Sequence, residues 1–196
     1  MAPVTARLRY PWGITPWALF GVTITAVALW LVPWGGSTGT LEIHIKDHRE
    51  AIDDFAALEL RIKTIRLGSR PSVNSQVSEW RDLNPQVMSL DLTQLTGKKT
   101  LRVFRGELKP ETFQAVHLDL SQLQGTLKDN PRPVPIDNRI GPIRMPLSID
   151  SSTVSRIVLD LVVLDISDHP PGGYELHIKG YEFFKGGQLI DKVPPG

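Results

Sequence analysis

Hydrophobic and polar positions follow two different patterns along this chain, and one pattern replaces the other near residue 40. Residues 14–34 form an apolar stretch without a charged side chain. At a rise of about 1.5 Å per residue, a helix of about twenty residues spans the hydrocarbon core of a bilayer. From residue 41 onward apolar and polar side chains alternate, which is typical of half-buried strands. The pattern therefore predicts a transmembrane helix over residues 14–34 and a β-rich domain over residues 41–196.

The flanks of the apolar stretch predict its orientation. Tryptophan is enriched where a membrane meets water, and a short flank with positive charge stays in the cytoplasm. The expected membrane-interface anchors are Arg7, Arg9, Trp12, Trp17, Trp30 and Trp34. Residues 1–13 are therefore expected to be a short cytoplasmic N-terminus, with the C-terminal domain on the extracytoplasmic side of the membrane.

A cleaved signal peptide is the alternative, because it also combines positive charge with an apolar core. The length of the stretch, its tryptophan ends and the lack of an A-x-A-like cleavage site favour an uncleaved signal anchor.

Small residues let another helix pack closely. The stretch and its flank contain four of them that could form such a contact surface: Gly13, Gly21, Thr23 and Thr25. Such residues are also common in membrane helices in general. Residues 35–40 are rich in glycine and predict a short tether that holds the domain close to the membrane.

Period-two alternation predicts most strands of the domain. Leu41, Ile43 and Ile45 alternate with polar residues, and the same pattern returns over residues 58–63. The apolar phase then slips to Ile65, which predicts a β-bulge or a bend. Further strands are expected over residues 86–92, 101–104, 113–120, 144–149, 155–166 and 174–184.

The remaining sequence features favour an antiparallel β-sandwich. The most continuous apolar run, residues 157–163, predicts a central strand that is covered on both faces. Gly186 and Gly187 predict a tight hairpin turn. Helical turns are expected only at residues 48–54 and 91–96. Many strands, few helices and abundant glycine and proline favour a mainly β fold.

Two long loops are expected at residues 68–78 and 128–142, both polar and rich in proline. Long loops on a rigid scaffold are places where binding is often found. The equal alternative is that these loops cover the surface and have no role.

Composition and motifs exclude several classes of function. The net charge is +1, and Arg7 and Arg9 supply two positive charges, so the rest of the chain has a net charge of about −1. This balance argues against a nucleic-acid partner. The chain has no cysteine, which excludes disulfides, thiolate metal sites and a lipobox. Nucleotide-binding loops, a Gly-x-Ser-x-Gly elbow and HExxH are absent. We therefore expect no enzyme, no catalytic residues and no cofactor.

A few side chains remain as candidates for binding. His44, His117 and His177 lie on the polar faces of predicted strands and could converge on a metal, but solvated histidines fit their wide spacing better, so no metal is expected. Trp80 is either core or an exposed stacking platform for a sugar. The consecutive Phe183 and Phe184 must point to opposite faces of a strand, so one of them lies against a second layer or on a partner surface. These three aromatic residues are the possible partner contacts.

A series of segments resembles an uncharacterised bacterial family of exported β-sandwich domains with a domain of unknown function. The segments, in the family's order, are residues 39–47, 55–65, 80–83, 90–95, 108–120 and 173–176. The resemblance spans about residues 39–185. It implies a sandwich likened to transthyretin-like or carbohydrate-binding domains, and no catalytic residues. Family members are usually lipoproteins, whereas this chain has no lipobox cysteine and a predicted helix in its place.

These observations predict a non-catalytic, single-pass accessory subunit of a bacterial membrane protein complex. Its β-sandwich would cap the periplasmic face, and photosynthetic and respiratory assemblies are candidate hosts. The expected partners are integral membrane protein subunits and the lipid bilayer. The alternative is a membrane-tethered binding module for glycans or envelope polymers. A membrane-bound hydrolase is the least favoured interpretation.

Overall fold

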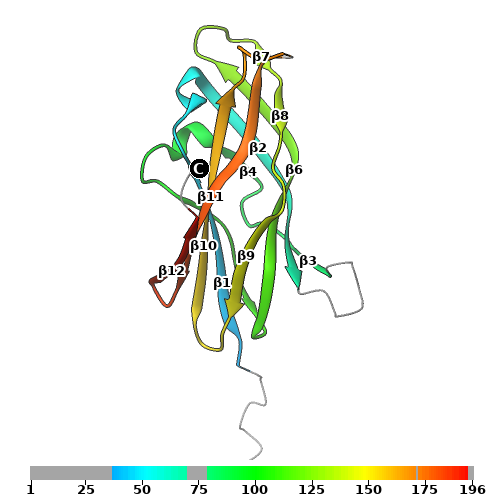
Figure 1. Cartoon of the computed structure of the whole chain (residues 1–196), viewed down its shortest axis with the longest axis vertical. Helices are drawn as coiled ribbons and strands as arrows, with labels where there is room; N and C mark the ends of the chain where they lie inside the picture. The colour runs from blue at the N-terminus through cyan, green and yellow to red at the C-terminus, as the bar shows by residue number, and fades with distance from the viewer. Residues whose placement is uncertain (1–36, 70–78, 171, 194–196) are drawn as a thin grey trace, which may run out of the picture. The chain divides into compact units, whose positions relative to one another are not determined.

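The computed structural model describes residues 37–69, 79–170 and 172–193 (Figure 1). The chain divides into two units, Met1–Gly36 and Ser37–Gly196, and the described residues belong to the second. Within these residues there is no helix with the length and apolar character needed to cross a membrane. The predicted transmembrane helix lies outside the described part of the chain. So do Arg7, Arg9, Trp12, Gly13, Trp17, Gly21, Thr23, Thr25, Trp30 and Trp34.

The described domain is mainly β and forms two sheets in a sandwich-like arrangement (Figure 1). The first, sheet A, has the order β12-β11-β10-β1-β5, with β8 beside β11. Its strands are β1 Gly39–Asp47, β5 Leu101–Leu108, β8 Ile136–Asn138, β10 Val154–Asp165, β11 Tyr174–Lys185 and β12 Gln188–Val193. The second, sheet B, has the order β3-β2-β6-β7, with β4 beside β2 and β9 beside β6. Its strands are β2 Phe55–Ser69, β3 Trp80–Leu83, β4 Ser89–Asp91, β6 Glu111–Leu127, β7 Pro133–Val134 and β9 Ile143–Ile149.

Strand β1 confirms the period-two prediction. Leu41, Ile43 and Ile45 are fully buried, whereas the polar residues between them are half-buried on the outer face of sheet A. The strand begins at Gly39, two residues before the boundary expected between tether and domain. The phase slip in β2 is also confirmed, since its pairing with β6 shifts between Ile62 and Thr64. The hydrophobic core lies between the sheets, and its largest fully buried side chains include Phe55, Phe113 and Phe183.

Strand β10 is central in sheet A, as the continuous apolar run predicts. It lies between β1 and β11, and residues on both of its faces, such as Leu159 and Val162, are buried. The β11–β12 hairpin is confirmed as well. Gly186 and Gly187 have φ values of 56° and 86°, and left-handed backbone at both central positions is the requirement of a type I′ turn. The two short helices η1 Ala51–Asp54 and η2 Leu92–Leu95 fall within the expected helical turns.

The sandwich is antiparallel only in part. Strand β1 runs parallel to β10, and β8 runs parallel to β11. Parallel neighbours need a long crossover connection. The connection from β1 to β10 contains all strands of sheet B, together with β5 and β8 of sheet A. The expected loop at residues 128–142 contains β7 and β8, and the expected strand at residues 86–92 is reduced to β4. Most of the expected loop at residues 68–78 lies outside the described residues.

Candidate functional site

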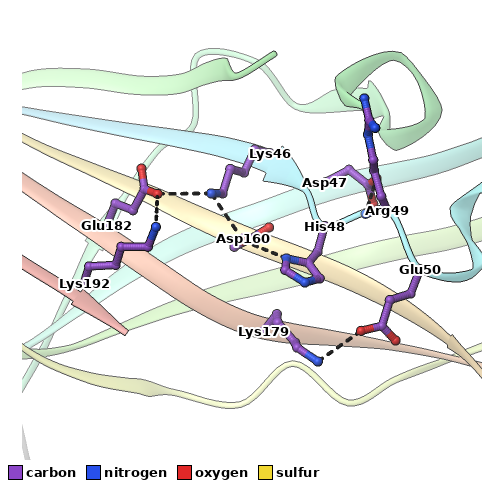
Figure 2. A network of polar contacts seen from close by, with 9 residues as sticks. All are labelled: Lys46, Asp47, His48, Arg49, Glu50, Asp160, Lys179, Glu182 and Lys192. Carbon is purple, nitrogen blue, oxygen red and sulfur yellow. Dashed lines mark hydrogen bonds and ion pairs between the residues drawn. The ribbon is translucent and has the colours of Figure 1, made fainter. Parts of the chain in front are cut away.

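Four charged side chains form a row across the outer face of sheet A, one from each of four neighbouring strands. This charged row consists of Lys46 on β1, Asp160 on β10, Glu182 on β11 and Lys192 on β12 (Figure 2). Strand register places Lys46 opposite Asp160 and Glu182 opposite Lys192. The Lys46 Nζ atom lies 3.3 Å from both Asp160 Oδ2 and Glu182 Oε1, and Lys192 Nζ lies 3.2 Å from the same Glu182 oxygen. Each carboxylate of the row lies beside at least one lysine, and opposite charges paired across strands stabilise the sheet.

The end of β1 extends the row by one histidine. The His48 backbone N–H donates to the Leu161 carbonyl at 2.8 Å, which places the imidazole Nδ1 3.1 Å from Asp160 Oδ2 (Figure 2). Only 6% of the Asp160 residue is exposed. A buried carboxylate is costly unless cations or hydrogen bonds compensate it. Lys46 and His48 provide that compensation at Oδ2, whereas Oδ1 has no hydrogen-bond partner among the described residues.

Asp47 is a second buried carboxyl group, and its surroundings satisfy it poorly. The residue is 3% exposed. Its Oδ2 atom accepts the backbone N–H of Arg49 at 2.8 Å, whereas Oδ1 has no hydrogen-bond partner among the described residues. Burial raises the pKa of Asp47 from its ordinary value of 3.8 to about 6, although the Arg49 N–H acts in the opposite direction. The bond fixes Arg49 with a φ of 72°, an unusual value for a residue other than glycine.

A pocket of about 200 Å³ lies over the charged row, lined in part by Asp47, Arg49 and Gly97. Gly97 leaves space for Arg49, because a Cβ atom there would lie 2.8 Å from the guanidinium Nη2. The cations and carboxylates of the row pair with one another. Their arrangement therefore holds the strands of sheet A together. Among the described residues, no group of three or more His, Cys, Asp or Glu side chains could hold a metal ion.

The three histidines named as a possible metal set lie on different sheets. His44 and His177 belong to sheet A, whereas His117 belongs to sheet B. His44 Nε2 lies 3.5 Å from a Glu42 carboxylate oxygen, and burial lowers the pKa of the His44 imidazole. His177 Nε2 lies 2.8 Å from Glu175 Oε2. Each of these two imidazoles therefore contacts a carboxylate on its own strand.

The three aromatic candidates lie in three different environments. Phe183 is 1% exposed and belongs to the core between the sheets. Phe184 points to the other face of β11, where the Arg156 guanidinium carbon lies 4.4 Å from its ring centroid. Trp80 lies on strand β3 at the edge of sheet B, with 39% of the residue exposed. The structure does not bring these residues together into one site.

Sequence reasoning missed a surface on the last strand. Strand β12 is the terminal strand of sheet A and exposes Leu189, Ile190 and Val193 at 52%, 55% and 42%. We call these three residues the β12 edge. The sequence does contain a signal for this surface, because the apolar pair Leu189-Ile190 closely follows the Gly186-Gly187 turn. What the sequence did not show is that no further described strand pairs with β12.

Comparison with known proteins identifies the family of this domain. The family model described as a domain of unknown function, DUF4382, matches residues 38–177. The chain therefore belongs to the DUF4382 family, which confirms the resemblance to an uncharacterised domain family. No curated protein and no solved structure matches the chain. The matched stretch ends within β11, so the β12 edge lies beyond it.

Proposed function

We propose that this member of the DUF4382 family is a non-catalytic, single-pass accessory subunit of a bacterial membrane protein complex. Residues 14–34 anchor it in the inner membrane, with the N-terminus in the cytoplasm and the β domain on the periplasmic side. The partners are integral membrane subunits, as found in photosynthetic and respiratory assemblies. The apolar segment and the positive charge before it support this topology.

The β12 edge is the observation that carries the proposed role. An edge strand offers unpaired backbone N–H and C=O groups, and natural proteins protect such strands with charges, proline or a covering segment. Strand β12 carries Asp191 and Lys192, which pair within sheet A, and it also exposes three large apolar side chains among its six residues. A strand of this kind suits pairing with an extended segment of another protein, in which backbone bonds supply affinity and apolar side chains supply contact area.

The opposite edge of sheet A provides a comparison within the same molecule. Strand β5 is covered there, because the backbone N–H of Gln86 donates to the Val103 carbonyl at 2.8 Å. The Gln86 side chain also donates to the Arg105 carbonyl at 3.0 Å. One edge of the sheet is therefore closed by the chain itself, whereas the β12 edge is open among the described residues.

Polar contacts hold β12 firmly against β11. The Tyr181 hydroxyl donates to Asp191 Oδ2 at 2.6 Å, and Lys192 pairs with Glu182 in the charged row. Because these groups already have partners inside the domain, the apolar residues of β12 remain available for an external contact. A preordered strand loses less conformational entropy when it binds.

We expect a photo-crosslinking amino acid at Ile190 to capture one integral membrane protein in intact membranes. The matched control is the same amino acid at Met88, which is 60% exposed but lies next to β4 in sheet B. Crosslinked bands on denaturing gels, identified by mass spectrometry, provide the measurement. A strong band from position 190 and none from position 88 supports docking at the β12 edge. Equal bands from both positions, or no band from position 190, would refute it.

A further inference from the structure

The indole of Trp80 covers a glycine on the outer face of sheet B. Strand register places Trp80 directly opposite Gly68, and Gly68 opposite Ala115 on β6. A Cβ atom on Gly68 would lie 3.2 Å from Cζ3 and 3.3 Å from Cη2 of the indole. The six-membered ring therefore occupies the space above a residue that has no side chain. Because 39% of Trp80 is exposed, the ring is supported from below and still presents a large part of its surface to solvent.

Two neighbouring side chains fix the position of the indole. The Arg66 guanidinium carbon lies 5.7 Å from the ring centroid, within the range of a cation–π contact. The His117 ring lies 6.4 Å from the indole at an interplanar angle of 65°, which is an edge-to-face arrangement. Arg66 and His117 are themselves direct partners on β2 and β6. A ring held in this way loses little entropy when a ligand covers it.

Hydrogen-bonding groups surround the indole on the same face of the sheet. Asp82 lies two residues after Trp80 on β3 and is exposed, and residues two apart on a strand share a face. Asp119 lies two residues after His117 and is 3.8 Å from the Arg66 guanidinium. Arg144 on β9 lies opposite Ala115. The face of sheet B that carries the indole therefore also carries two carboxylates that accept hydrogen bonds and two guanidinium groups that donate them.

This combination fits a sugar better than the other ligands that stack on aromatic rings. The face of an indole carries partial negative charge and attracts polarised C–H bonds, which one face of a pyranose ring presents. Sugar hydroxyl groups both donate and accept hydrogen bonds, so they match carboxylates and guanidinium groups together. A single-stranded nucleic acid would require a basic groove along its backbone, whereas here Asp82 and Asp119 offset the charges of Arg66 and Arg144.

We propose that Trp80 is the stacking platform of a carbohydrate subsite that takes a pyranose ring of a glycan. Arg66 and His117 are positioning residues, and Asp82, Asp119 and Arg144 bind hydroxyl groups. This inference goes beyond the role proposed above, because Trp80 belongs to sheet B and the β12 edge to sheet A. An accessory subunit with this subsite would hold its complex against a polysaccharide as well as against its protein partner.

The experiment is a titration of the full-length chain in detergent micelles with cellohexaose, chitohexaose and glucose. The indole N–H resonance of Trp80, assigned as the one lost in Trp80→Phe, reports contact at the ring. We expect the hexasaccharides to shift this resonance in a saturable way. Glucose should bind more weakly, because only a longer glycan also reaches the hydroxyl-binding residues. If glucose shifted the resonance and neither hexasaccharide did, the proposal that the ligand is a glycan would be overturned.

Three variants separate the platform from general apolar contact. Trp80→Leu keeps an apolar cover over Gly68 but removes the aromatic face, so hexasaccharide affinity by calorimetry should fall about tenfold. Trp80→Phe should retain part of the affinity, and Met88→Leu, at an exposed apolar residue elsewhere, should retain all of it. Thermal unfolding confirms that each variant is folded.

The proposal is overturned if no hexasaccharide shifts the Trp80 resonance at millimolar concentrations, or if Trp80→Leu binds as tightly as the native chain. Crosslinking from Ile190 should be unchanged in Trp80→Leu, which keeps the two proposals separable.

Discussion

Replacing Phe183 by alanine is expected to lower the free energy of unfolding of the domain by about 3–5 kcal/mol, as for other fully buried aromatic residues. Phe183 is 1% exposed and lies in the core between the two sheets. Its strand, β11, lies between β10 and β12 in sheet A. Truncation would therefore leave a cavity in the middle of the fold, where neighbouring strands can relax little. Chemical denaturation of the full-length chain in detergent measures the change.

Phe184→Ala is the matched control for Phe183→Ala. The two residues have the same chemistry and adjacent positions, but Phe184 lies on the outer face against Arg156. Its removal costs the cation–π contact and part of the buried area, about 1 kcal/mol. If Phe184→Ala destabilised the domain as much as Phe183→Ala, the assignment of the two faces of β11 would be incorrect.

Replacing Asp47 by asparagine is expected to raise the free energy of unfolding by about 2 kcal/mol at about pH 7. The native carboxylate is buried, and its Oδ1 atom has no hydrogen-bond partner among the described residues. An asparagine oxygen can still accept the Arg49 N–H, which Asp47 accepts at 2.8 Å. The substitution therefore removes a buried charge and keeps the hydrogen bond that shapes the turn.

The effect of Asp47→Asn should depend on pH in a definite direction. Burial raises the pKa of Asp47 from 3.8 to about 6 in the folded state. Between these values the folded chain binds more protons than the unfolded chain, so this group makes stability fall as pH rises. The stability difference between variant and native protein should accordingly be small at about pH 4, grow up to about pH 6 and stay constant above it. Urea denaturation at a series of pH values tests this expectation. A stability difference that does not depend on pH would contradict a raised pKa of Asp47 in the folded state.

Local patterns predicted the elements of this fold well. The alternation of Leu41, Ile43 and Ile45 gives β1, because a strand with one buried face must repeat every two residues. The slip near Ile65 marks the register shift in β2, and Gly186 with Gly187 gives the last hairpin. Each of these features depends on residues that are close in sequence.

Pairings between distant segments could not be predicted in the same way. Nothing in residues 39–47 indicates that β1 runs parallel to β10 more than a hundred residues later, with Lys46 beside Asp160. The same limit applies to the histidines, since strand parity gave the face of His117 but not the sheet that carries it. Strands β7 and β8 are too short for a periodic signal. The β12 edge required the strand order, which only the three-dimensional structure provides.

Purification of the tagged full-length chain from its native membranes in mild detergent tests the proposed role as an accessory subunit most directly. The measurement is the mass of the purified particle and the molar ratio of its subunits. We predict a particle in which the chain and integral membrane proteins occur in a fixed ratio. Ile190→Lys should lower that ratio, whereas Met88→Lys should leave it unchanged. A monodisperse particle that contains only this chain would contradict the proposal.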